Sequence, residues 1–350
     1  MKTRIFAFTA IACLLLNFVA FASTDTRKQR AKKRVMSRLV SQLPASDGIA
    51  VFEARRFLGD ALPQILTANQ PVLGQIMAKV SEIENRTGID LRKFDNVVVG
   101  VAMKQIKAKE VDFETVAIAN GDVNAAALIA VAKLASKGTY REEQISGRTV
   151  FVFTAKDVMQ KTSTQTSSSK IAGMMDKALD GLTKEIAVTT LDANTLVLGN
   201  FKRVRETLEA KTRPSADLTA KLMQNSSAVM SFAVKTPDGM SKFMPLDNDE
   251  LGKNVDSIRF LSGSLDVASV GTSLQVTAQT LKAEQAEGLK STLEGLQMLG
   301  KAILGGSKRT DQQVYGRLVK AAKFISRGNE VTLDLLVPQA DIDILIAGVK

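Results

Sequence analysis

Residues 96–122 constrain the fold of this 350-residue chain most, because they predict a β-hairpin. Apolar and β-branched runs at residues 97–99 and 115–119 are typical of strands, and the second run ends at the turn-forming pair Asn120-Gly121. A second pair of predicted strands lies at residues 258–267 and 273–281. A long helical pattern follows each pair, which indicates a duplicated α+β unit.

The order of predicted elements is strand, helix, hairpin, helix, and then strand and helix, in both parts of the chain. We therefore expect an α+β fold of two similar α+β halves, each a mostly antiparallel sheet with hairpins packed against helices. The boundary is placed near Gln224, which gives one domain at 46–223 and another at 224–350. Within them, Asp122 is expected to cap a helix that carries Val123, and residues 311–326 are expected to form one helix.

The composition excludes several kinds of chemistry. The chain has no histidine and no tryptophan, and Cys13 is its one cysteine. Ser-His-Asp and Cys-His catalysis are therefore excluded. Zinc sites usually draw on the same two side chains, so we expect no metal site and no cofactor. Without disulfides, the fold has to be stabilised by burial of apolar side chains.

The N-terminus has the pattern of a secretory signal peptide. Lys2 and Arg4 precede an uncharged apolar run at residues 5–21. A cleavage site of the A-x-A type follows, with Ala20 and Ala22 before Ser23. Residues 1–22 are therefore predicted to be removed, which leaves a mature chain without cysteine that is periplasmic or secreted.

Two other interpretations of this segment stay open. Cys13 could be the acylated residue of a lipoprotein signal, although the apolar run continues past it. The run could also stay uncleaved and anchor the protein in the inner membrane, since its length is near the lower limit for a spanning helix. The basic residues that follow the run oppose export, because positive charge tends to stay on the cytoplasmic side.

The positive charge of the chain is concentrated in one segment. The net charge is +11, yet from residue 39 onward there are 38 basic and 35 acidic residues. Residues 23–45 are predicted to form a basic, flexible arm. Its seven basic residues, which we expect to contact an anionic surface, are Arg27, Lys28, Arg30, Lys32, Lys33, Arg34 and Arg38.

The arm has two interpretations. It could lie on anionic lipid headgroups or another polyanion, or it could be a solvated linker. Val35, Met36, Leu39 and Val40 could start a short helix, but the apolar content predicts no packing. Specific nucleic-acid binding is not expected, because the mature chain offers few aromatic side chains for stacking.

Two stretches and the closing elements carry a family resemblance. The stretches are GIAVFEARRFLGDALPQIL and TGIDLRKFDNVVVGV, and a strand followed by a helix closes the chain. In these features the chain resembles uncharacterised exported bacterial proteins of the domain-of-unknown-function type, mainly in its first half. The resemblance implies an exported α+β architecture and nothing catalytic.

The sequence favours a non-enzymatic binding or scaffold protein of the bacterial envelope, without naming its ligand or protein partner. The alternative is a carboxylate-dependent hydrolase with its cleft between the two halves, because Asp and Glu are plentiful. An enzyme of this kind should bring carboxylates with perturbed pKa values together in a cleft. A scaffold should instead leave its acidic residues dispersed.

Overall fold

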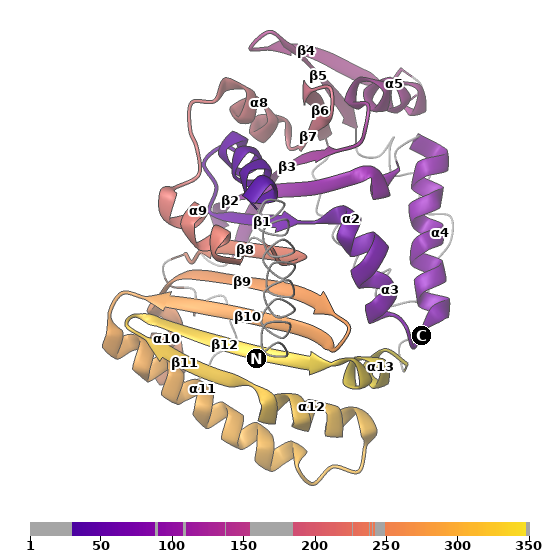
Figure 1. Cartoon of the computed structure of the whole chain (residues 1–350). Helices are drawn as coiled ribbons and strands as arrows, with labels where there is room; N and C mark the ends of the chain where they lie inside the picture. Colours follow the sequence, from indigo (N-terminus) through magenta and orange to yellow (C-terminus); the bar gives the residue numbers. More distant parts are fainter. Residues whose placement is uncertain are drawn as a thin grey trace, which may run out of the picture.

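A computed structural model describes residues 30–87, 90–107, 110–136, 138–154, 185–225, 227–237, 239, 241 and 249–347. Within these residues, twelve strands form one sheet in the order β11-β12-β10-β9-β8-β1-β2-β3-β7-β6-β5-β4. Figure 1 shows this order from β4 at the top to β11 at the bottom. All neighbouring strands are antiparallel, which confirms the predicted α+β class.

The strands are β1 (Gly48–Phe52), β2 (Phe94–Lys107), β3 (Glu110–Gly121), β4 (Tyr140–Ile145), β5 (Arg148–Thr154), β6 (Glu185–Asp192), β7 (Thr195–Gly199), β8 (Met230–Lys235), β9 (Ile258–Ala268), β10 (Gly271–Thr280), β11 (Lys323–Arg327) and β12 (Glu330–Pro338).

Residues 30–42 form the N-terminal helix. The other helices are α2 (Ala54–Arg56), α3 (Leu62–Ile65), α4 (Gln70–Thr87), α5 (Ala125–Ala135), α8 (Phe201–Glu209), α9 (Ala216–Leu222), α10 (Asp249–Asp256), α11 (Ala283–Leu304), α12 (Thr310–Ala321) and α13 (Gln339–Ala347). A π-helical turn, η1 (Phe57–Ala61), joins α2 to α3, and short 3-10 turns occur at η2 (Leu91–Lys93) and η3 (Met223–Asn225).

The two predicted domains share the sheet. β1 pairs with β2 on one side and with β8 on the other, so hydrogen bonds cross the predicted boundary near Gln224. The helices that follow β1 also pack across it, since Ala61 contacts Val229 and Val267. The chain therefore does not separate into two sheets at residue 224. The internal duplication stays a prediction.

Helices cover the two faces of the sheet differently. The first face carries the largest core, in which the N-terminal helix, α8 and α9 pack on strands β1–β8. On the second face, α2 and α5 pack against Phe94, Ala119 and Leu196. Further along the second face, α11 packs against Ile258 of β9 and Val331 of β12.

The strands β9, β10 and β12 carry polar side chains on their first face. Thr277 and Thr332 lie opposite each other with their hydroxyl oxygens 3.0 Å apart. Beside them, the Gln275 amide donates to Asp334 at 2.8 Å. This alternation of polar and apolar residues is the pattern of a sheet that is solvated on one side.

Several predicted elements differ from the structure. Both hairpins, β2–β3 and β9–β10, are confirmed, but β2 and β3 extend through the charged residues between them, so that Lys104 faces Asp112. The α5 cap is Asn124, which accepts from the Ala127 amide, and not Asp122. The predicted helix at 311–326 ends at Ala321, because residues 323–327 pair with β12 instead.

Candidate functional site: the basic face of the N-terminal helix

The N-terminal helix is part of the main core, contrary to the prediction of a flexible arm. Met36, Leu39, Val40 and Leu43, which we call the anchor residues, are each at most 1% exposed. Their spacing of three and four residues places them on one side of a helix. The sequence contained this signal, but the density of basic residues around it suggested a solvated segment. The apolar side is sufficient to dock the helix on the sheet.

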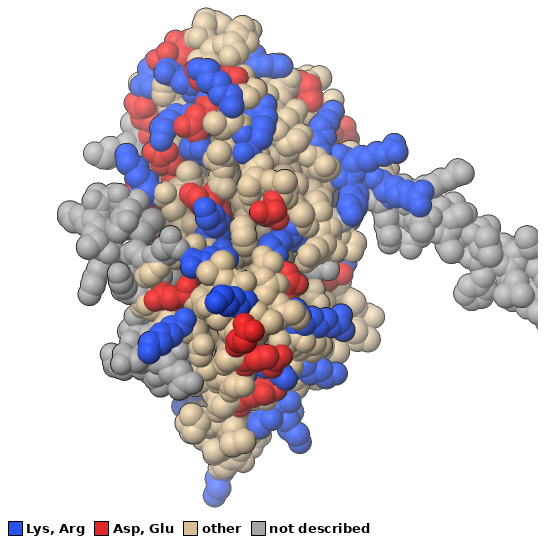
Figure 2. Space-filling view, turned by 90° about the vertical axis from the view of Figure 1, so that its left-hand side faces the viewer, with Lys and Arg blue, Asp and Glu red and all other residues tan. Residues whose placement is uncertain are grey.

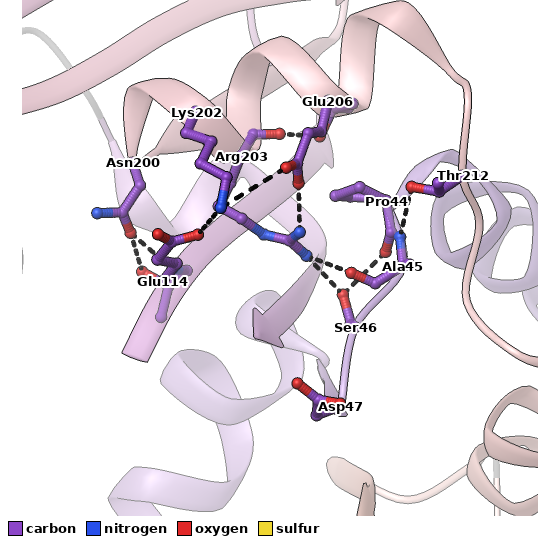
Figure 3. A network of polar contacts seen from close by, with 12 residues as sticks. Pro44, Ala45, Ser46, Asp47, Glu114, Asn200, Lys202, Arg203, Glu206 and Thr212 are labelled. Carbon is purple, nitrogen blue, oxygen red and sulfur yellow. Dashed lines mark hydrogen bonds and ion pairs between the residues drawn. The ribbon is translucent and has the colours of Figure 1, made fainter. Parts of the chain in front are cut away.

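Arg203 of α8 fixes the backbone that follows this helix. Its guanidinium donates to the Ala45 carbonyl at 2.7 Å and to the Ser46 hydroxyl at 3.0 Å, and it forms an ion pair with Glu206 (Figure 3). Arg203 is almost completely buried. A buried guanidinium is costly to leave unpaired, so these bonds hold the turn between the helix and β1 in one conformation.

Asn200 also links α8 to the sheet. It directly precedes α8, but its side chain makes no capping hydrogen bond to the helix. The side-chain oxygen instead accepts from the Thr115 amide of β3 at 2.6 Å (Figure 3). At the other end of the same network, the Ala45 amide donates to the Thr212 hydroxyl at 3.3 Å. The N-terminal helix is thus tied to the body by polar bonds as well as by its anchor residues.

The predicted surface-contact residues have different surroundings. Arg30, Lys33, Arg34 and Arg38 are exposed, and we call them the basic face. Arg30, Arg34 and Arg38 follow one another at intervals of four residues, on the side of the helix away from the anchor residues. The nearest carboxylate recorded for this face is Asp192, 3.8 Å from Arg38. Figure 2 shows Lys and Arg side chains gathered at the right-hand edge of the molecule, whereas both signs are mixed over the rest of that view.

Lys32 does not belong to the basic face. It is half-buried and forms an ion pair with Glu53, which directly follows β1 and is 4% exposed. Burial raises the pKa of Glu53, and the hydrogen bond and charge of Lys32 act in the opposite direction. Lys32 therefore acts as the partner of a buried carboxylate, and the pair fastens the start of the helix to the sheet.

A second ion pair lies beside the first. Arg56 binds Asp266 of β9 at 2.7 Å and donates to the Ser227 carbonyl at 2.9 Å. Glu53 and Asp266 are carboxylates from the two predicted domains, and the charge of Asp266 contributes to the raised pKa of Glu53. Each carboxylate has a cation as partner. This arrangement is typical of ion pairs that hold elements together.

Some predicted residues fall outside the described part of the chain. These are the cleavage-site residues Ala20, Ala22 and Ser23 and the basic residues Arg27 and Lys28. In the described ranges, no group of three or more acidic, His or Cys side chains is placed to hold a metal ion. Of the helices described, none is long and apolar enough to span a membrane.

Sequence reasoning missed Glu53 and Arg203. The sequence predicts a strand at residues 48–54, and Glu53 lies close to its end, where a charged residue is usually exposed, so nothing in the local pattern indicated burial. Arg203 occurs in an amphipathic helix among other charged residues. Its role depends on residues 45 and 46, which are far away in the sequence and are brought near only by the fold.

Comparison with known proteins gives only distant structural neighbours. No protein-family model matches the chain, and no curated protein matches it. Crystal forms III, IV and I of TP0453 match with TM-scores of 0.42, 0.41 and 0.40. Their sequence identities are 11%, 10% and 10%, over 88% of this chain and 97%, 96% and 96% of theirs. Similarity at this level does not bear on function.

Proposed function

We propose that this protein is an exported, non-enzymatic binding or scaffold protein of the bacterial envelope that contacts an anionic membrane surface. The observation that carries this proposal is the anchored N-terminal helix, on which Arg30, Lys33, Arg34 and Arg38 are all exposed. A hydrolase between the halves has less support, because Glu53 and Asp266 are both ion-paired.

Anchoring makes the basic face a better binding surface than a flexible arm would be. A flexible segment loses conformational entropy when it is ordered on a surface, whereas a docked helix has already lost it. Each basic residue near an anionic membrane contributes about 1 kcal/mol. The four residues of the basic face therefore supply up to about 4 kcal/mol, or roughly a thousandfold in affinity. Arg38 contributes less than the others because Asp192 lies close to it.

Vesicle binding tests this function. We expect the mature chain, residues 23–350, to float with vesicles that contain anionic lipid and not with zwitterionic vesicles, and we expect added salt to release it. Replacement of Arg30, Lys33, Arg34 and Arg38 by Ser should abolish flotation. The matched control replaces four exposed lysines elsewhere, Lys93, Lys104, Lys211 and Lys320, by Ser and has the same net charge.

The control separates a local face from general basicity. If both quadruple variants lose binding equally, attraction depends on total charge and the basic face has no special role. If neither variant loses it, the proposal is wrong.

Export is tested separately by the intact mass of the protein in each fraction of a bacterial host that expresses the full gene. The proposal predicts a soluble exported species that begins at Ser23. A full-length species in the membrane fraction would instead indicate the uncleaved inner-membrane anchor and place the basic face on the cytoplasmic side.

A further inference from the structure

Helix α11 is apolar on both sides along its C-terminal half. Ala286 and Leu289 are buried against the sheet, and Leu293 packs with them. Further along the same side, the Gln297 amide donates to the Val319 and Ala322 carbonyls at 2.7 and 2.8 Å, which attaches α11 to the end of α12. These contacts define the inner side of the helix and leave the opposite side outward.

Four large apolar side chains along this half of the helix are exposed, and we call them the α11 stripe. They are Leu296, Met298, Leu299 and Ile303, exposed by 48%, 73%, 60% and 77%. A helix that is apolar all round is normally buried on all sides. Figure 1 shows α11 at the lower edge of the molecule, outside the sheet. The stripe is thus placed where another molecule can reach it.

Small residues lie within the stripe. A Cβ atom added at Gly295 would meet no atom within 4 Å, so this glycine borders open space. Ala302, seven residues later, is exposed. Two helical turns separate the two positions, so both lie on the same side of the helix. Small residues between Leu and Ile side chains allow another helix to approach closely.

The charges beside the stripe favour a second copy of this chain over a lipid surface. Glu294 and Lys301 are both exposed and are also seven residues apart, so they lie along one edge of the stripe. When two such helices pack antiparallel, the Glu294 end of one lies against the Lys301 end of the other. The arrangement gives two equivalent ion pairs. An anionic membrane would instead repel Glu294.

We infer that the α11 stripe is a self-association surface through which two copies of this chain form an antiparallel, twofold-symmetric dimer. A contact of this type is isologous: each copy supplies the same residues, and the contact closes after two chains. The apolar side chains supply the driving force. The ordered pair of opposite charges sets the antiparallel direction.

Sedimentation velocity of the mature chain measures this association. At about 200 μM, well above the micromolar dissociation constants of weak interfaces, we expect the mass of a dimer, and dilution should return the monomer. Leu299→Glu should give a monomer at every concentration. The control, Leu134→Glu, changes another strongly exposed leucine, on α5, and should leave the dimer intact.

Charge variants test the antiparallel direction. Glu294→Lys alone and Lys301→Glu alone each place like charges together at both ends of the dimer. Each variant should therefore raise the dissociation constant of the dimer about three- to tenfold. An equimolar mixture of the two single variants places opposite charges together again. It should form a heterodimer at least as tight as the wild-type dimer.

The heterodimer result distinguishes this inference from a local effect on the helix, such as loss of the contact of Glu294 with Lys290 at 3.7 Å. If the effect were local to the helix, association in the mixture would be as weak as association of either variant alone. Monomeric wild-type protein at 200 μM, or a dimer that Leu299→Glu leaves unchanged, would overturn the inference. The inference would also be overturned if the wild-type protein were a monomer that binds anionic vesicles and the Leu299→Glu variant did not bind them. The stripe would then be a lipid contact.

Discussion

Single side chains decide whether the basic segment belongs to the folded body. Leu39 is completely buried in the main core, and Lys32 from the same helix is the ion-pair partner of buried Glu53. The hydrophobic contact and the ion pair attach the helix to the sheet at different points. Each can be removed by one substitution, so their contributions can be measured separately.

Leu39→Ala should lower the free energy of unfolding by about 2–5 kcal/mol, because it leaves a cavity in a packed core. Urea denaturation at equilibrium measures this change. Ser37→Ala, on the exposed side of the same helix, should change it by less than about 0.5 kcal/mol. A loss at Leu39 no larger than that at Ser37 would mean that the helix is detached from the core.

The contribution of Glu53 should depend on pH with a definite sign. Burial raises its pKa above the ordinary 4.5, so the folded protein keeps a proton there that the unfolded chain has released. The contribution of Glu53 to stability is therefore largest below pH 4.5 and falls as the pH rises through the raised pKa. Denaturation of the wild type and of Glu53→Gln at a series of pH values from below 4.5 upward measures the free energy of unfolding of each. The wild type should lose stability as the pH rises, and Glu53→Gln should lack this loss.

Lys32→Met should be most destabilising where Glu53 is ionised. At about pH 7 it leaves a buried carboxylate without its cation, and we expect a loss of about 1–3 kcal/mol. At about pH 4 the carboxyl is protonated and the loss should shrink. The double variant Lys32→Met/Glu53→Gln should recover most of the stability at pH 7. Equal losses at both pH values would exclude Glu53 as the cause.

At the scale of elements, local pattern predicted the strands and hairpins well. The β2–β3 and β9–β10 hairpins lie where apolar and β-branched runs predicted them, and a long helix, α11, follows the second hairpin as expected. The misses involve contacts distant in sequence. Residues 323–327 continue a helical pattern, but pairing with β12 makes them a strand. The basic helix was missed as a packed element because its partners are distant strands.

The connection from β7 to α8 depends on Gly199. Its φ is +151°, and an added Cβ would lie 2.4 Å from the Thr115 carbonyl oxygen. Gly199→Ala should therefore cost about 3 kcal/mol or more, because the backbone of β3 would have to move. Gly147, in the β4–β5 turn, has φ +74° but open space around it, so Gly147→Ala should cost only about 1 kcal/mol. Thermal unfolding measures the loss of stability in each variant. Equal losses would contradict the close approach of Gly199 to the Thr115 carbonyl oxygen.

At the scale of the whole molecule, one sheet joins the two predicted domains. The sequence predicted an α+β fold but divided it near Gln224, because the same order of elements starts again after that point. Pairing of β1 with β8 connects residues that are about 180 positions apart, and no local pattern indicates such pairing. The structure therefore predicts that the two parts unfold together.

Single-tryptophan variants test this cooperativity, because the chain has no tryptophan of its own. Phe151→Trp reports on β5 and Phe324→Trp reports on β11, which lie toward opposite ends of the sheet. The urea midpoint of the fluorescence change should agree with that of circular dichroism in each variant, in one transition. A separate, earlier transition at either tryptophan would indicate two independent domains.

Hydrogen exchange at residues 34–43 of the mature chain tests most directly whether the basic segment is a fixed element of the fold. The first four amides of a helix have no partner within it, so protection should begin near residue 34. We predict that residues 34–43 are protected as strongly as β1, with which they share the core. Exchange at the rate of an unstructured peptide would contradict the account, because the basic face would then belong to a flexible arm.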